Sequence, residues 1–150
     1  MFVSRPGVVI GRAGSGIEEI KKQLTTFFQN NGKNGKMMPR FDLRVEQVKD
    51  INLDAVLVSR SVAEGLVRRL AFKRVLGQTA DKVMNSGALG VRIQLSGRIN
   101  GSEIGRKEKI QVGTVPLSTI RANIDYADFP ALTKKGYIGV KVWINRQEEK

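Results

Sequence analysis

After about residue 88 the sequence changes from helix-like to strand-like periodicity and does not change back. Before that point, residues 53–70 predict a helix, because apolar side chains recur at four-residue spacing, at Val58, Val62, Leu66 and Leu70. A second helix is predicted over residues 72–84, and Gly87 marks its end. Further on, the sequence predicts strands at 91–95, 109–116, 119–126 and 138–144. Two helices followed by four strands, without a helix between the strands, are typical of an α+β fold.

The N-terminal part of the chain has its own pattern, in which glycines separate short apolar segments from a helix. The sequence predicts a short strand at 2–4, a turn at Pro6 and Gly7, and one apolar turn at 8–10. A glycine-rich stretch at 11–16 follows.

A helix is predicted to begin at Ser15, with Glu18 completing a capping box. Its apolar face consists of Ile17, Ile20, Leu24, Phe27 and Phe28. The asparagine- and glycine-rich residues 30–36 end this helix and predict a loop. Alternating apolar and charged residues at 41–46 then predict a strand.

The charge of the chain points to a polyanionic partner. Lysine and arginine total 26 among the 150 residues, against 14 acidic residues, and the net charge is +12. Residues 1–50, 51–87 and 88–150 carry net charges of +4, +3 and +5, so the excess is not confined to a tail. Nucleic acid and anionic membranes both attract such a protein, although a merely basic surface is the simpler alternative.

The sequence gives no sign of a membrane route. Its longest apolar runs, such as 55–58, fall far short of the ~18 residues that span a bilayer. Arg5 and Pro6 lie where a signal peptide would have its apolar region. We therefore expect no membrane partner and a location in the cytoplasm or inside an organelle.

The absence of cysteine and histidine excludes most catalytic and metal-binding chemistry. Thiolate nucleophiles, cysteine-ligated metals and Ser-His-Asp catalysis cannot be built from this chain. We therefore expect a protein that is not an enzyme and that needs no cofactor or metal. The remaining enzymatic alternative is a magnesium-dependent nuclease acting through Asp125 and Asp128, although two such carboxylates are more often simply solvated.

The most informative short motif is the GxxG sequence Gly11-Arg12-Ala13-Gly14. It lies between an apolar turn and an amphipathic helix, where glycines let the backbone approach a phosphate and the start of the helix adds free N–H groups. The same spacing recurs at 32–35, 87–90 and 136–139, where turn chemistry explains it. Only the first copy has the context of a KH module, and a plain turn is the alternative.

The densest basic cluster consists of Arg68, Arg69, Lys73 and Arg74, at the junction of the two helices of the second half. Arg69 and Lys73 share a face if the helix continues through Phe72. The alternative is a solvated helix end, where cations complement the helix dipole. The aromatic residues are few and scattered, and we expect most of them in the core.

Three long segments carry a resemblance to a known family. Gly90–Arg106, Val115–Tyr126 and Tyr137–Ile144 are similar, in order and spacing, to the C-terminal domain of bacterial-type small-subunit ribosomal protein three. Upstream, Arg5–Gly14 resembles the KH loop of that family, and Arg68–Arg74 resembles its connecting helices. The resemblance covers residues 2–28 and 50–146.

The resemblance implies two domains. Residues 1–49 would form a type II KH RNA-binding module, incomplete at its N-terminus because the family has an additional helix and strand before this start. Residues 50–150 would form the C-terminal α+β ribosomal domain, with two helices and a four-stranded sheet. A structural constituent of the head of the small subunit is implied, in a bacterial or organellar ribosome. Its partners would be small-subunit rRNA, mRNA at the entry channel, and ribosomal proteins ten and fourteen.

The resemblance also implies roles for individual residues. Lys73 and Arg74 match two basic positions that grip mRNA in the family. The third such position falls at Gly77, and Gln78 also replaces a residue that is usually basic. This departure predicts a weaker grip on mRNA. Our complete set of expected RNA-binding residues is Gly11, Arg12, Ala13, Gly14, Arg68, Arg69, Lys73, Arg74, Arg98, Arg106 and Lys107. A free KH-type RNA-binding or ribosome-assembly factor is the alternative function.

Overall fold

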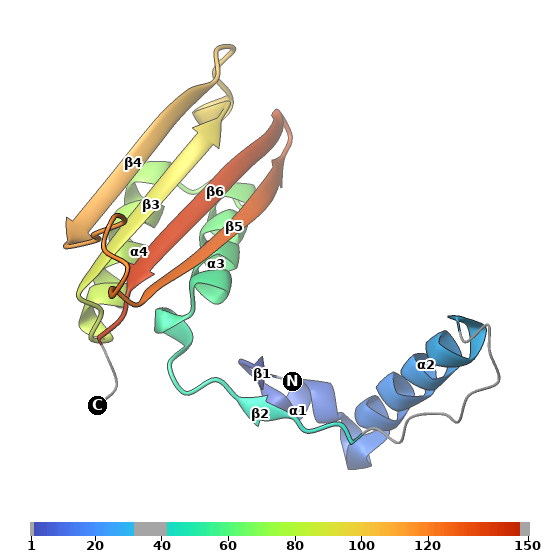
Figure 1. Cartoon of the computed structure of the whole chain (residues 1–150). Coiled ribbons are helices and arrows are strands. Elements are labelled where there is room, and N and C mark those ends of the chain that lie inside the picture. The colour runs from blue at the N-terminus through green and yellow to red at the C-terminus, as the bar shows by residue number, and fades with distance from the viewer. Residues whose placement is uncertain (1, 32–41, 148–150) are drawn as a thin grey trace. The chain divides into compact units, whose positions relative to one another are not determined.

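A computed structural model describes residues 2–31 and 42–147 of the chain (Figure 1). The chain divides into two compact units, which we call unit 1 (residues 1–49) and unit 2 (residues 50–150). Each unit is described by itself below.

Unit 2 consists of two helices packed on one face of a four-stranded sheet (Figure 1). The helices are α3 (Ala55–Val67) and α4 (Phe72–Asn85). The strands are β3 (Gly90–Gly97), β4 (Arg106–Gly113), β5 (Ile124–Thr133) and β6 (Gly136–Asn145). Their order across the sheet is β4-β3-β6-β5, and all neighbours are antiparallel. Single helical turns lie at Ile51–Leu53 and Ile99–Gly101. The predicted α+β fold is confirmed.

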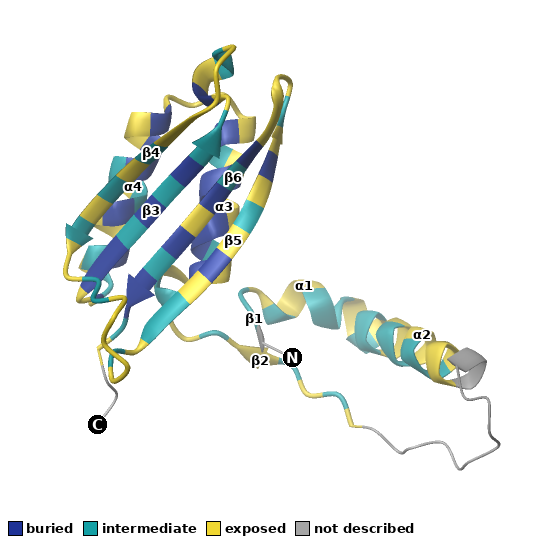
Figure 2. Cartoon of the chain, turned by 45° about the horizontal axis from the view of Figure 1, so that its top comes forward, coloured by how far each residue is buried: buried dark blue, intermediate teal, exposed yellow. Residues whose placement is uncertain are grey.

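The core of unit 2 lies between the helices and the sheet. Along β3 the side chains of Val91, Ile93 and Leu95 are fully buried, while the residues between them face the other side (Figure 2). Helix α3 buries six residues and α4 buries five, as expected for helices with one apolar face. The Asp54 side chain caps α3 by accepting hydrogen bonds from the backbone N–H groups of Val56 and Leu57. Among residues 50–147, no helix or second sheet covers the sheet face opposite α3 and α4.

The predicted helix over residues 53–70 is too long. Helix α3 ends at Val67, and Arg69 adopts a left-handed conformation with φ of 61°. The N–H of Leu70 then donates to the carbonyl of Gly65, which closes the helix end in the manner of a Schellman motif. The helix therefore does not continue through Phe72, and Arg69 and Lys73 do not share the face of one helix.

The predicted strand at 119–126 is wrong, because β5 begins at Ile124 and runs to Thr133. The preceding residues form turns, in which Thr119 N–H donates to the Pro116 carbonyl and Ala122 N–H to the Thr119 carbonyl. These local hydrogen bonds replace the sheet partners that a strand would need. Strand β4 also lies three residues earlier than the predicted 109–116.

Unit 1 contains two helices joined by the GxxG sequence and one pair of short strands. Its helices are α1 (Pro6–Ile10) and α2 (Ser15–Asn31), separated by a 3-10 turn at Arg12–Gly14. Strands β1 (Phe2–Val3) and β2 (Glu46–Gln47) pair in parallel. None of the residues of unit 1 whose burial the structure describes is buried (Figure 2).

Two predictions for the first helices of unit 1 are corrected. The turn expected at Pro6 and Gly7 is the start of α1, with Pro6 in the first turn, where its missing N–H costs no helical hydrogen bond. Ser15 is not a cap, because it already has the helical φ and ψ of −56° and −35°. An N-cap residue is non-helical, so the expected capping box with Glu18 does not form.

The strand predicted at 41–46 is also displaced and shares only Glu46 with β2. Residues 42–45 form no strand, Phe41 lies outside the described residues, and β2 begins at Glu46. In the parallel register Phe2 faces Glu46 and Val3 faces Gln47. The loop predicted at 30–36 falls largely outside the described residues, and α2 includes Asn30 and Asn31.

Candidate nucleic-acid interface

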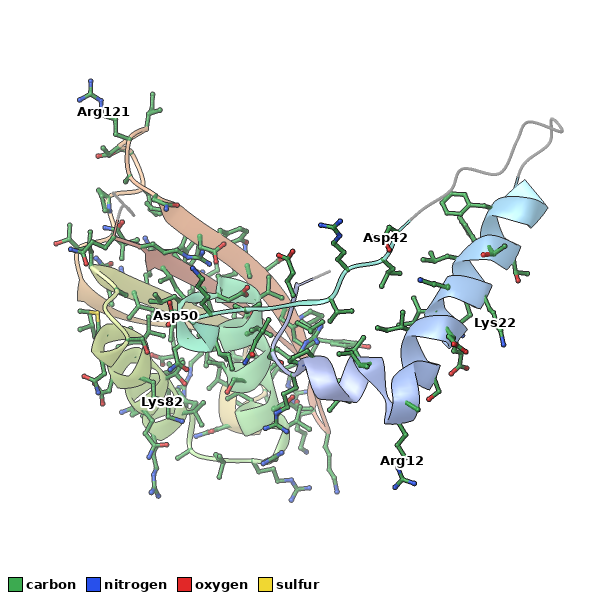
Figure 3. All side chains as sticks on the ribbon, turned by 90° about the horizontal axis from the view of Figure 1, so that it is seen from below. Arg12, Lys22, Asp42, Asp50, Lys82 and Arg121 are labelled. Atoms are coloured by element: carbon green, nitrogen blue, oxygen red, sulfur yellow. The ribbon has the colours of Figure 1, made fainter. Side chains whose placement is uncertain are left out.

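The GxxG sequence forms a tight corner between α1 and α2. Gly11, Ala13 and Gly14 all have positive φ, of 71°, 53° and 83°. The corner is tight enough that a β-carbon on the following Gly16 would lie 2.3 Å from the carbonyl oxygen of Val9. The side chain of Arg12 is exposed and projects away from the ribbon at this corner (Figure 3). Local glycine chemistry therefore presents backbone and one cation together at the start of a long helix.

The other predicted residues gather at one end of unit 2, which we call the basic end. It consists of the turn between the helices (68–74), the end of β3 to the start of β4 (97–107), and the β5–β6 hairpin (133–136). These three segments carry nine basic residues and one acidic residue, Glu103. The antiparallel pairing brings the two strand segments together, because β3 ends, β4 begins and β5 turns into β6 at the same end of the sheet. A strongly positive surface results.

Arg69 and Arg98 line one pocket of the basic end, together with Lys134 and Lys135. The Arg98 guanidinium donates through Nε to the Ser102 carbonyl at 2.8 Å and through Nη1 to the Lys135 carbonyl at 3.4 Å. Arg98 therefore ties the segment after β3 to the β5–β6 hairpin as well as contributing charge. Lys134 and Lys135 were missed at the sequence level, because their hairpin comes near α3 only through pairing of strands distant in sequence.

A second group lies at the start of α4. Lys73 and Arg74 are exposed in the first turn of this helix, and Ala71 precedes it without a side-chain cap. Arg106 contacts Phe72, the residue that precedes them, with its guanidinium carbon 5.9 Å from the centre of the ring. Arg106 also forms an exposed ion pair with Glu108 at 3.4 Å. The uncapped N–H groups of a helix start and three cations together suit an anionic ligand.

Two of the predicted residues are separated from these groups. Arg68 lines a different depression, against Pro130 and Leu132. Lys107 faces the uncovered side of the sheet, because it neighbours Arg106 along a strand and adjacent strand residues point to opposite faces. Gly77 follows Lys73 by one turn of α4, and a β-carbon there would meet no atom within 4 Å.

The expectation that most aromatic residues lie in the core is wrong for the part of the chain that the structure describes. Phe72 is buried, but Tyr126 is 47% exposed and contacts Trp143 on the uncovered sheet face, with ring centres 5.3 Å apart. Arg92 lies on the other side of Trp143, at 5.1 Å from its centre. The alternation of side chains along β6 could have predicted that Trp143 lies on the uncovered face, since its neighbours Val142 and Ile144 are buried on the other face.

The two carboxylates of the nuclease alternative do not form a site. Asp125 accepts hydrogen bonds from the N–H of Ala55 at 2.9 Å and from the Arg146 guanidinium, so it joins β5 to the start of α3. Asp128 is three residues further along the same strand and therefore points to the opposite face. Among residues 2–31 and 42–147, no cluster of three potential metal ligands is found. No helix within these ranges is long and apolar enough to cross a bilayer.

Two families match the chain, and the boundary between their matches lies within α3 rather than between the two units. Residues 1–60 match the KH domain family, and residues 62–144 match the family described as ribosomal protein S3, C-terminal domain. The two matches define a protein that combines a KH-type region with a ribosomal α+β domain. The chain belongs to the ribosomal protein S3 family.

Curated relatives of the chain include small ribosomal subunit proteins uS3 and uS3c. Over 148 residues, the chain is 45% identical to small ribosomal subunit protein uS3 of Salinibacter ruber and 42% identical to that of Ligilactobacillus salivarius. It is 39% identical over 149 residues to uS3c of Rhodomonas salina. Each comparison covers 99% of this chain but 59%, 64% and 65% of the respective relative. The chain thus spans about three fifths of the length of these relatives.

Proposed function

We propose that the chain is a structural, non-catalytic constituent of the small ribosomal subunit that binds small-subunit rRNA. The observation that carries this proposal is the basic end of unit 2, with nine basic residues and one acidic residue on three converging segments. Such a surface binds the phosphate backbone through counterion release, and compact folds use it to hold RNA without chemical turnover. Membership of the ribosomal protein S3 family supports the same conclusion.

The GxxG corner of unit 1 supplies a second RNA contact in this proposal. Gly11, Arg12, Ala13 and Gly14 offer backbone and charge at the start of α2, which is the manner in which KH modules clamp a nucleotide backbone. A glycine corner alone would serve equally as a plain turn. The exposed Arg12 and the match of residues 1–60 to the KH domain family favour the RNA contact.

The start of α4 is the proposed contact for mRNA. Lys73, Arg74 and Arg106 lie together there, beside uncapped N–H groups of the helix. Because a moving message offers no fixed sequence, these contacts are to phosphates. Gly77 leaves the next turn of this face without a cation. The helix therefore binds mRNA more weakly than one with a basic residue at that position.

The proposed surroundings are those of a bacterial or organellar ribosome. The proposed partners also include the neighbouring ribosomal proteins ten and fourteen. For these two proteins, the proposal rests on the family resemblance.

Co-sedimentation with small ribosomal subunits at moderate salt tests the proposal. A structural constituent sediments with the subunit, whereas a free KH-type RNA-binding or assembly factor binds RNA but stays in the supernatant. Incubation of labelled RNA with the chain and Mg²⁺ tests for a nuclease. Cleavage that Asp125→Asn abolishes would contradict a non-catalytic role, and intact RNA is the expected result.

A further inference from the structure

The basic end of unit 2 contains a pocket of about 410 Å³ between the turn after α3 and the β5–β6 hairpin. Its lining combines three apolar side chains, four basic ones and three small or polar residues. They are Leu66, Leu70 and Ile138; Arg69, Arg98, Lys134 and Lys135; and Asn100, Gly101 and Thr133. None of these lining residues is acidic. A pocket of this size lies in the range that accepts small organic ligands.

Hydrogen bonds from side chains to backbone carbonyls hold the walls of this pocket in place. The two bonds from Arg98 to the carbonyls of Ser102 and Lys135 fix one wall against the hairpin. The Thr133 hydroxyl donates to the Gly136 carbonyl at 2.7 Å and closes the hairpin itself. The left-handed turn at Arg69 sets the third wall. Pre-formed walls reduce the ordering cost of binding a ligand.

The floor and the rim of the pocket have opposite chemistry. Leu66 and Ile138 are 8% and 4% exposed, so they form an apolar floor, and Leu70 extends it while remaining 53% exposed. The four cations line the same pocket. A ligand that fits both parts has a flat, largely apolar body and negative charge at its edge. A nucleotide within an RNA strand has this combination.

We propose that the pocket receives one unstacked nucleotide of an RNA strand, with the base against Leu66, Leu70 and Ile138. The flanking phosphates face the four cations. A base within a duplex is held between its neighbours and cannot enter, so the pocket selects an unpaired nucleotide. This inference rests on the proposed function in that the ligand is RNA. It adds where one nucleotide is held and that the nucleotide must be unpaired.

Binding of the full chain to three RNA hairpins tests this proposal. The first hairpin has a fully paired stem, the second carries one bulged adenosine, and the third carries the same bulge without its base. We expect the bulged adenosine to bind about tenfold more tightly than either of the others. Burial of roughly 60 Å² of apolar base surface at about 25 cal/mol per Å² corresponds to a factor of that order.

Variants at Leu70 connect this preference to the pocket. Leu70→Asp places a carboxylate on the apolar floor and should abolish the preference for the bulged adenosine, while Leu70→Ser should reduce it. Leu117→Asp is the matched control, because Leu117 is 51% exposed and lies outside the basic end. It should lower affinity for all three hairpins slightly and keep the preference. Circular dichroism checks that each variant folds.

The outcomes separate this inference from the proposed function. Equal affinity for the bulges with and without a base would show that only phosphates are bound, and it would overturn the nucleotide pocket. A preference that survives Leu70→Asp, or that is lost equally in Leu117→Asp, would also overturn it. Binding to all three hairpins alike would leave the proposed RNA-binding function standing, whereas binding to none would contradict that function as well.

Discussion

Unit 2 has a buried core and the described part of unit 1 has none, although similar patterns predicted helices in both. Helix α3 buries six residues against the sheet. In α2 the equivalent apolar residues Ile17, Ile20 and Leu24 are half-buried, and Phe27 and Phe28 are 60% and 47% exposed. An amphipathic pattern therefore shows which face of a helix is apolar. Whether that face is buried depends on a second layer.

The second layer explains the difference between the units. Unit 2 offers a sheet of four strands of eight to ten residues each, which is wide enough to cover two helices. The strands β1 and β2 of unit 1 have two residues each. Because most helix stability in proteins comes from tertiary packing, we expect unit 2 to be the more stable of the two.

The largest expected effect comes from matched isoleucine truncations. Ile93→Ala in β3 removes a fully buried side chain and should cost unit 2 about 2–5 kcal/mol of its free energy of unfolding. Ile20→Ala in α2 removes a half-buried one and should not shift the unfolding of unit 2. Denaturant unfolding followed by the fluorescence of Trp143, the only tryptophan, reports on unit 2. Similar shifts of the Trp143 transition in both variants would contradict the contrast.

Matched carboxylates extend the comparison to polar interactions. Asp125→Asn removes a part-buried charge that holds the start of α3 and Arg146, and should cost about 1.5–3 kcal/mol. Asp42→Asn breaks the ion pair with Arg44, which joins two side chains that are 75% and 82% exposed. That change should cost less than about 0.5 kcal/mol, because exposed ion pairs contribute little. The urea midpoints of unfolding of the two variants measure these losses of stability. Equal shifts would show that burial of a carboxylate does not determine how much it contributes to stability.

Much of unit 2 could be predicted because its core repeats a simple pattern. The four-residue spacing of α3 and the alternation of β3 and β6 appear directly in the sequence, as does the end of α4 near Gly87. The start of β5 could not be predicted, since it depends on its pairing with β6, where Ile124 faces Asn145. Local apolar residues such as Ile120 suggested a strand although this side chain is fully exposed.

The sequence singled out candidate basic residues, but it did not predict how they are grouped in space. The basic cluster at the helix junction is contiguous in sequence, so Arg69 and Lys73 were found together. They belong to different groups, because Arg69 turns into the pocket with Lys135 while Lys73 continues onto α4. The Arg92–Trp143–Tyr126 contact was missed because it crosses three strands, and only the sheet register brings its members together.

Each unit has a basic turn with a left-handed residue other than glycine, at Ala13 in unit 1 and at Arg69 in unit 2, and these turns provide the next matched pair. Arg69→Gly should stabilise unit 2 by about 1 kcal/mol, because relief of left-handed strain exceeds the entropy that glycine adds to the unfolded chain. Ala13→Gly relieves the same strain in unit 1 and should leave the Trp143 transition unchanged. Thermal unfolding monitored at Trp143 measures both. A destabilised Arg69→Gly variant would show that the arginine side chain supports the turn.

The smallest expected effect concerns the salt dependence of RNA binding and compares the two basic surfaces directly. Changing both Lys73 and Arg74 to Ala removes two phosphate contacts of unit 2. For single-stranded RNA, the slope of log K against log salt should flatten by about 1.4, nearly equally across sequences. Binding to rRNA should suffer less, because Arg69, Arg98 and the hairpin lysines remain. An unchanged salt slope would identify Lys73 and Arg74 as a solvated helix end and remove the mRNA role.

Two companion variants sharpen this last comparison. Replacing Arg12 and Ala13 by Asp puts two carboxylates at the GxxG corner and should weaken RNA binding. The left-handed position of Ala13 tolerates aspartate, so circular dichroism should show an intact fold.

Gly77→Lys should steepen the salt slope by roughly 0.7, and the space around Gly77 accommodates the side chain. Because replacing a helix-interior glycine also adds about 1 kcal/mol of stability, Gly77→Ala is the control. If Gly77→Lys and Gly77→Ala bind RNA equally, the exposed face of α4 does not meet the RNA strand, and the GxxG corner becomes the better candidate for the single-strand contact.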